Sequence, residues 1–98
     1  MTSQDGGSSR STELVECREA IEEIDRRIVA LLAERINVAR RTGALKREAG
    51  QPILDPKREA EVIRRAVASA REQEVPTEPV REIFWHIVGM SRRAQEAE

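Results

Sequence analysis

Two cations interrupt an apolar stripe in the first half of the chain. Arg35 stands where the spacing of apolar residues calls for another apolar side chain, and Lys46 follows on the same helical face. Near the C-terminus, Ser91 and Gln95 continue the stripe of Val88 in the same way. Taken singly, each cation is explained by a long side chain that reaches solvent, and each polar residue by a fraying helix end. Together they predict a site for a small polar dianion.

A dense charged turn, Asp-Pro-Lys-Arg-Glu, runs from Asp55 to Glu59. Aspartate followed by proline is typical of a helix start. The free backbone amides of such a start can bind oxygen atoms of a ligand, with Arg58 and Glu59 beside them. Ordinary solvated charge that compensates the helix dipole is the alternative interpretation.

Arg18 lies beside the same stripe, seventeen residues before Arg35. Along one straight helix this is about 25 Å, so the two residues of one chain cannot hold the same small molecule. If the helix pairs antiparallel with a second copy, Arg18 of the partner subunit approaches Arg35 and Lys46. A two-fold axis then gives two equivalent sites, each using both chains.

The longest expected element is a helix of roughly 36 residues, from a cap at Ser11 or Thr12 to about Glu48. Residues 1–10 are rich in Gly and Ser, and we expect a disordered tail there, ahead of a single domain over 11–98. Gly43 interrupts the helix at about 1 kcal/mol relative to Ala, which we interpret as a tolerated weakness; close backbone approach is the alternative. The helix carries a heptad seam formed by Leu14, Cys17, Ile21, Ile24, Ile28 and Leu31.

Two shorter helices follow a turn at 50–52. The first has its cap at Asp55 and ends near Gln73, and the second has its cap at Thr77. Their apolar faces are formed by Ala60, Ile63, Val67 and Ala70, and by Val80, Phe84, Ile87 and Val88. At about 27 Å each they cannot cover the whole seam of the first helix. The predicted fold class is therefore all-α, a three-helix subunit that forms an intertwined homodimer.

Composition excludes several classes of protein. A formal net charge of −1 gives no diffuse positive field for nucleic acid or an anionic membrane. Cys17 is the only cysteine and His86 the only histidine, so we expect no intramolecular disulfide and no thiolate zinc site. No apolar run is long enough to span a membrane, and the polar residues 1–10 are unlike a secretory signal. The expected compartment is the cytoplasm.

The same residues, in order, resemble the all-helical (type II) chorismate mutases over about residues 14–95. The resemblance implies a domain-swapped dimer with two active sites, which rearranges chorismate to prephenate without a cofactor or a metal. It is carried by Arg18-Glu19-x-Ile21-x-x-Ile24-Asp25, Leu31-Leu32-Ala33-Glu34-Arg35, Gly43-x-x-Lys46, Pro52-Ile53-x-Asp55-x-x-Arg58-Glu59 and Ser91-x-x-x-Gln95.

This resemblance also implies roles for single residues. Arg35 and Arg18 of the partner subunit would hold the two substrate carboxylates, with Arg58 and Ser91 assisting. Guanidinium groups suit this task because their fork of N–H donors imposes orientation as well as charge.

The remaining implied roles concern the reaction itself and the ring. Lys46 and Gln95 would donate to the ether oxygen, where negative charge develops in the transition state. With Arg35 they are the expected catalytic residues. Glu59, together with the backbone amide of Asp55, would bind the ring hydroxyl.

Other functions stay open at this point. Isochorismate pyruvate-lyase and aminodeoxychorismate mutase would keep the arginines and the lysine on the same scaffold, although Glu59 favours a ring hydroxyl at the chorismate position. A non-catalytic helical dimerisation module predicts that Arg35 and Lys46 are dispensable and exposed. It gives Ser91 and Gln95 no reason to lie on an apolar face.

Overall fold

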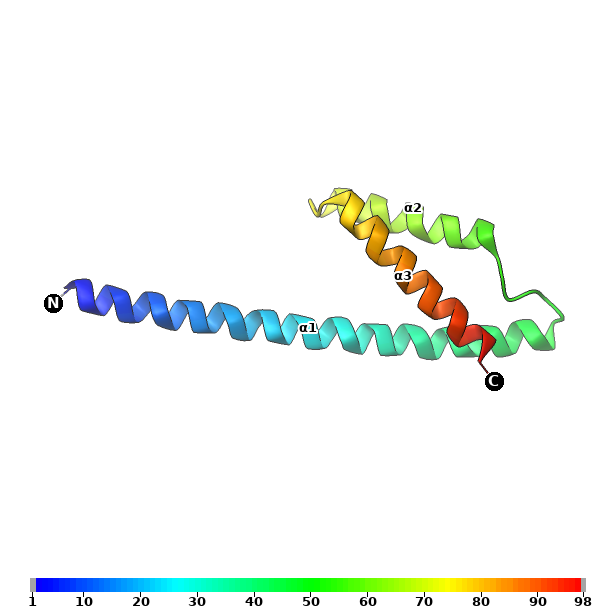
Figure 1. Cartoon of the computed structure of the whole chain (residues 1–98), viewed down its shortest axis with the longest axis horizontal. Coiled ribbons are helices and arrows are strands. Elements are labelled where there is room, and N and C mark those ends of the chain that lie inside the picture. Colours follow the sequence, from blue (N-terminus) through cyan, green and yellow to red (C-terminus); the bar gives the residue numbers. More distant parts are fainter. Residues whose placement is uncertain (1, 98) are drawn as a thin grey trace. The chain divides into compact units, whose positions relative to one another are not determined.

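Three helices make up the computed structural model, which describes residues 2–97, with side chains from Ser9 onward. They are α1 (Thr2–Glu48), α2 (Pro56–Glu72) and α3 (Thr77–Glu96) (Figure 1). Residues 2–97 contain no strand, and the predicted all-α class with one long and two shorter helices is confirmed. Within this range, no helix combines the length and the apolar character that a membrane span requires.

The bounds of α1 agree with prediction at one end only. The helix ends at Glu48 as expected, but it begins at Thr2 instead of at a cap on Ser11 or Thr12. Glycine and serine have low helix propensity, which is why the sequence pointed to a later start. The disorder expected for residues 1–10 stays a prediction, because that segment lies partly outside the described residues.

The chain divides into two units, residues 1–32 and 33–98. In the first unit the predicted seam is exposed, with 47% to 63% of the surface of Leu14, Ile21, Ile24, Ile28 and Leu31 accessible. Cys17, the remaining seam residue, is exposed as well. A repeated apolar face left in solvent is typical of a helix that packs against another chain. The homodimer remains a proposal.

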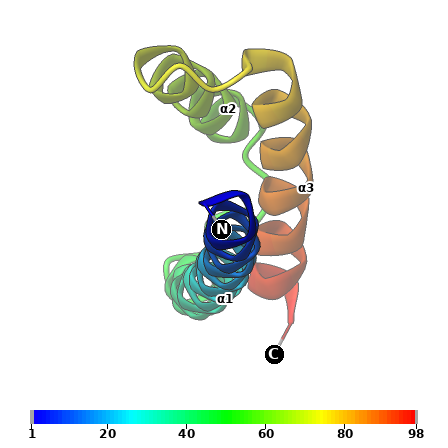
Figure 2. The ribbon, with the colours of Figure 1, turned by 90° about the vertical axis from the view of Figure 1, so that its left-hand side faces the viewer.

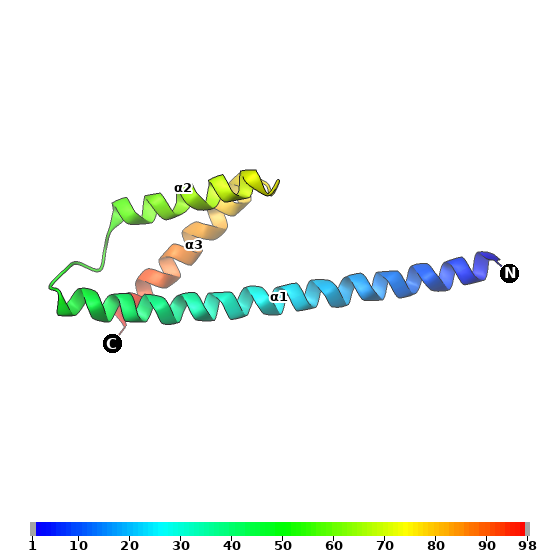
Figure 3. The same cartoon turned by 180° about the vertical axis from the view of Figure 1, so that it is seen from behind.

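In the second unit, α2 and α3 pack against each other. Ile63 and Val67 of α2 and Val88 of α3 are buried, with Val62 and Phe84 at the edge of the cluster. Figures 2 and 3 show the two helices side by side where α2 leads into α3. Each buried side chain contributes about 1.5–3 kcal/mol relative to exposure, so a cluster this small gives one subunit limited stability.

The helix starts explain how α2 and α3 are placed. Asp55 caps α2 by accepting a hydrogen bond from the backbone N–H of Arg58 (3.1 Å), and Pro56 is the first helical residue, as predicted. The predicted cap of α3 at Thr77 is wrong by one residue. Pro76 takes the extended cap conformation (φ −54°, ψ 126°) without a side-chain cap bond, so Thr77 is already helical.

A Schellman turn closes α1. The backbone N–H of Gly50 donates to the carbonyl of Arg47 (3.2 Å), and that of Gln51 donates to the carbonyl of Lys46 (2.8 Å). Gly50 has a φ of 66°, a left-handed conformation that costs glycine nothing because it has no Cβ. The turn fixes the last helical residues of α1 and the direction of the linker to α2.

Candidate active site

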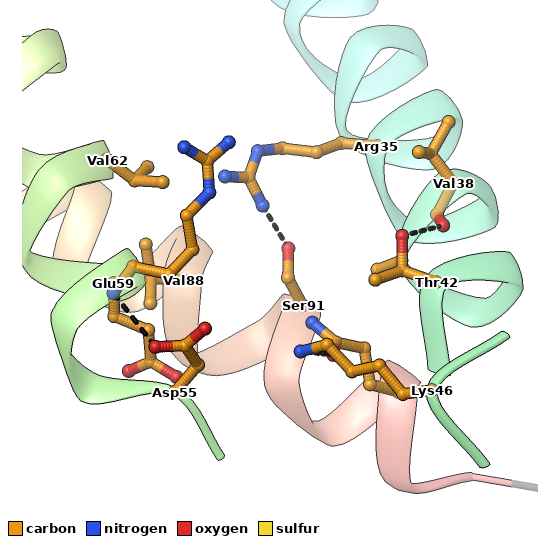
Figure 4. A pocket seen from close by; sticks show the side chains of 12 residues that line it. Arg35, Val38, Thr42, Lys46, Asp55, Glu59, Val62, Val88 and Ser91 are labelled. Atoms are coloured by element: carbon orange, nitrogen blue, oxygen red, sulfur yellow. Dashed lines mark hydrogen bonds between the residues drawn. The ribbon is translucent and has the colours of Figure 1, made fainter. Parts of the chain in front are cut away.

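A pocket of about 420 Å³ opens within residues 33–98, between the C-terminal part of α1, the start of α2 and the last turns of α3 (Figure 4). Such a volume suits a small organic ligand. Apolar and polar side chains contribute to its wall, which is formed by Arg35, Val38, Ala39, Thr42, Lys46, Asp55, Arg58, Glu59, Val62, Val88, Ser91 and Gln95.

Arg35 reaches from α1 toward α3, where its guanidinium donates a hydrogen bond to the Ser91 hydroxyl (Figure 4). Ser91 is buried and Arg35 half-buried. Burial, and then the positive charge of Arg58, lower the pKa of Arg35, but an arginine stays protonated at neutral pH. None of the ion pairs among the described side chains includes Arg35, so its charge is available to an anion.

Lys46 is held by two neutral acceptors. Its Nζ donates to the backbone carbonyl of Ile53 (3.0 Å) and to Oε1 of Gln95 (2.9 Å). Neither partner carries a negative charge, and the third ammonium hydrogen remains for a ligand. The contact also orients the Gln95 amide, because its Oε1 accepts from Lys46 and its NH₂ hydrogens take no part in this bond.

Gly43 allows α1 and α3 to come into close contact at Gln95. Gly43 is buried, and a Cβ at this position would lie 2.4 Å from the backbone oxygen of Gln95 and 2.7 Å from its Cα. Arg47 adds a hydrogen bond from its guanidinium to the same oxygen (2.7 Å). The interpretation of Gly43 as a tolerated weakness is therefore wrong. The close backbone approach fixes the main chain from which the Gln95 amide projects.

The first turn of α2 supplies the acidic side of the pocket. Arg92 of α3 forms a bidentate contact with the Glu59 carboxylate. Its Nε donates a hydrogen bond to Oε2 and its Nη2 donates one to Oε1, each at 2.9 Å. These hydrogen bonds, and then the negative charge of Glu59, raise the pKa of Arg92. Asp55 directs its carboxylate to the α2 backbone as a cap. In Figure 4, Asp55 and Glu59 lie across the pocket from Thr42.

The structure brings nearly all sequence-predicted site residues to this one pocket: Arg35, Lys46, Asp55, Arg58, Glu59, Ser91 and Gln95. Arg18 is exposed and lies in the unit of residues 1–32, outside the unit that contains the pocket. The half-buried Arg35 and Lys46 contradict the solvent-exposed cations that a mere dimerisation module predicts.

Two residues that bond to pocket residues, Arg47 and Arg92, were not predicted from the sequence. Neither interrupts an apolar stripe, and their partners lie 48 and 33 positions away along the chain. The only available signal was that Arg92 directly follows Ser91.

The arrangement suits recognition of a small dianion. Arg35 and Lys46 provide positive charge without acidic partners. Arg58, which forms an ion pair with Glu61 (3.7 Å), is a third cation at the pocket wall. The Ser91 hydroxyl is engaged by Arg35, and neither cysteine nor histidine lines the pocket, so its wall offers no partnered nucleophile for covalent catalysis. Orientation and electrostatic stabilisation are what this set of groups can supply.

Comparison with known proteins identifies the family. The family model described as chorismate mutase type II matches residues 17–96, a range that includes every residue of the pocket. The chain belongs to the type II chorismate mutase family. A chorismate mutase of Methanocaldococcus jannaschii is 32% identical over 83 residues, covering 85% of this chain and 84% of that protein.

This chain also matches parts of longer proteins. A bifunctional chorismate mutase/prephenate dehydratase of Aquifex aeolicus is 40% identical over 60 residues, 61% of this chain but 17% of that protein. A 3-dehydroquinate dehydratase of Pyrobaculum aerophilum is 49% identical over 49 residues, 50% of this chain but 16% of that protein.

The family fold is also found in a solved structure, that of a conserved hypothetical protein from Pyrococcus furiosus. It is 38% identical, superposes with a TM-score of 0.69, and the match covers 86% of this chain and 96% of that one.

Proposed function

We propose that this type II family member is a chorismate mutase, which rearranges chorismate to prephenate as a homodimer and without a cofactor. The observation that carries the proposal is the convergence of two uncompensated cations, Arg35 and Lys46, with the neutral groups of Ser91 and Gln95 in one pocket. This set matches a dianionic substrate whose reaction develops charge on one oxygen.

Arg35 binds one substrate carboxylate, and the Ser91 hydroxyl fixes the guanidinium in place for it. Arg58, at the pocket wall, assists. The second carboxylate requires a further cation, which we assign to Arg18 of the partner subunit. Two guanidinium groups gripping two carboxylates hold the flexible substrate in the compact shape that brings the bond-forming carbons together.

Lys46 and Gln95 act on the ether oxygen. In the concerted rearrangement one ether C–O bond breaks and one C–C bond forms, so no proton, electron or group leaves the molecule. Negative charge grows on the oxygen in the transition state, and the charged Lys46 and the amide NH₂ of Gln95 stabilise it more than the ground state. Their mutual hydrogen bond (2.9 Å) supports this role because both donors are already oriented before substrate binds.

The apolar seam of residues 14–31 supports the dimer. Its side chains are about half exposed in one subunit, and a second copy that covers them would bring Arg18 with it. Dimer formation and completion of the site are thus one event in this proposal.

The test follows the loss of chorismate absorbance, with prephenate identified as product, for the wild type, Arg35→Ala and Lys46→Ala. Arg40→Ala is the matched control, since Arg40 is an exposed cation of α1 that contacts Asn37 outside the pocket. We expect turnover by the wild type and the control, and a loss of about a hundredfold or more in each site variant.

The outcomes separate the related functions. A folded, dimeric wild type that leaves chorismate unchanged but releases pyruvate from isochorismate would be a lyase on the same scaffold. A protein inactive on both compounds, with Arg35 and Lys46 dispensable for dimerisation, would be an interaction module.

A further inference from the structure

Arg92 stands outside the pocket wall, yet it makes the most extensive contact to one of the pocket's own side chains. Its guanidinium bonds both oxygens of Glu59 at 2.9 Å each, and the Glu59 side chain is only 16% exposed. We propose that Arg92 is a positioning residue that fixes Glu59 as a hydrogen-bond acceptor and thereby sets the preference for a substrate with a ring hydroxyl. The inference rests on the proposed function.

The geometry determines what Glu59 can offer to a ligand. An ionised carboxylate has about four acceptor positions and no donor. The parallel bonds from Arg92 occupy one position on each oxygen and prevent rotation of the group. The remaining acceptor positions of Glu59 can accept a hydrogen bond from a hydroxyl, and they repel a negatively charged ring substituent. The fixed Glu59 therefore selects for a hydrogen-bond donor on the substrate ring.

Charge gives a second reason for the pair. The pocket must bind a dianion, and an unpaired Glu59 would cancel part of the field of Arg35 and Lys46. Arg92 lies on the α3 side of Glu59 and balances its charge, because an arginine stays protonated at neutral pH. Glu59 can therefore accept a hydrogen bond without repelling the substrate carboxylates.

A purely structural role is the alternative, since the pair also joins α2 to α3 across 33 positions of sequence. The two roles differ in what they predict for substrate choice. If the pair only stabilises the packing of α2 on α3, its loss affects the turnover of all substrates alike. If Arg92 positions Glu59, its loss affects only substrates that contact Glu59.

The experiment measures kcat/KM for the wild type, Arg92→Gln, Glu59→Gln and the double variant. Each is assayed with chorismate and with the analogue that lacks the ring hydroxyl. Arg93→Gln is the matched control, because Arg93 is the next residue of α3, carries the same charge and is exposed. Thermal unfolding of every variant is recorded alongside.

We expect Arg92→Gln to lower kcat/KM for chorismate by about ten- to a hundredfold, as loss of a charged contact and a misplaced acceptor would. The same change should have little effect on the analogue. The double variant should be no worse than Glu59→Gln alone, because Arg92 acts through Glu59. Arg92→Lys, which keeps the charge but not the fork, should lie between wild type and Arg92→Gln, and it serves if Arg92→Gln does not fold.

An active wild type whose Arg92 variants behave like Arg93→Gln, or whose losses are equal for both substrates and additive with Glu59→Gln, overturns the inference alone. A folded wild type that converts no chorismate removes the proposed function, and this inference with it.

Discussion

Gly43→Ala sets two effects of opposite sign against each other. In a helix interior, alanine is favoured over glycine by about 1 kcal/mol, so propensity alone predicts a more stable protein. The new Cβ, however, would lie 2.4 Å from the backbone oxygen of Gln95, about 1 Å closer than the 3.4 Å at which ordinary contacts begin. Because the atoms it meets belong to the backbone of α3, no side-chain rotation relieves the clash.

We expect the clash to outweigh the gain in helix propensity and to lower both stability and activity. Overpacking of this kind costs about 1–3 kcal/mol, which offsets the propensity gain and leaves a net loss of up to about 2 kcal/mol. The last turns of α3 must shift by about 1 Å, and the Gln95 amide shifts with them, away from its 2.9 Å contact with Lys46. A misplacement of 1 Å in a catalytic group can cost about a hundredfold in rate, so we expect kcat to fall by that order.

Gly89→Ala is the matched control. Gly89 lies in α3, and a Cβ there would meet only the end of the Arg93 side chain, at 3.6 Å. We expect the full gain of about 1 kcal/mol and unchanged activity. Urea unfolding and initial rates with chorismate measure both variants. If Gly43→Ala is stabilised as much as Gly89→Ala and retains its kcat, the close approach does not position Gln95.

Three further predictions concern the cap, the seam and the pH response. Asp55→Ala should lower the free energy of unfolding by about 1 kcal/mol, while Asp55→Asn, which can still cap α2, should not; urea unfolding distinguishes them. Ile24→Lys should place a charge on the exposed seam and give inactive monomers in sedimentation, and an active dimer would contradict the proposed interface. Activity should be flat from about pH 6 to 8, since the lowered pKa of Arg35 and the raised pKa of Arg92 both stay far above neutrality. The charge on Arg35 opposes folding at any pH below its lowered folded pKa, and the charge on Arg92 favours folding until pH rises through its own raised folded pKa. Neither contribution changes between pH 6 and 8, so a steep rate profile there would refute the prediction.

The helices were predictable because their signals are local. The Asp55-Pro56 start of α2, the turn at Gly50 and the apolar spacing of Ile63 and Val67 each depend on a few neighbouring residues. The polar breaks at Arg35 and Lys46 were visible for the same reason, since a periodic stripe shows where an apolar residue is missing. The start of α1 and the cap of α3 were misplaced because boundaries depend on weak competing propensities.

What could not be predicted depends on contacts between distant segments. The sequence shows Gly43 but not which helix crosses it, so its packing role emerges only with α3 in place. Arg92 pairs with Glu59 across 33 positions, and nothing beside Arg92 indicates the partner. The role of Arg18 requires a second chain, which is why residues of one subunit support it only as a proposal.

Loops between helices ordinarily accept insertions and deletions, because they make few contacts that depend on their length. The linker between α1 and α2 should not. Gly50 fixes its first residues, Ile53 accepts a hydrogen bond from the Lys46 ammonium, and Asp55 at its end caps α2. One added residue would move either that carbonyl or the start of α2, so the length of this linker belongs to the active site. The turn at 73–76 does not line the pocket, and an inserted segment or fused domain should be accepted there.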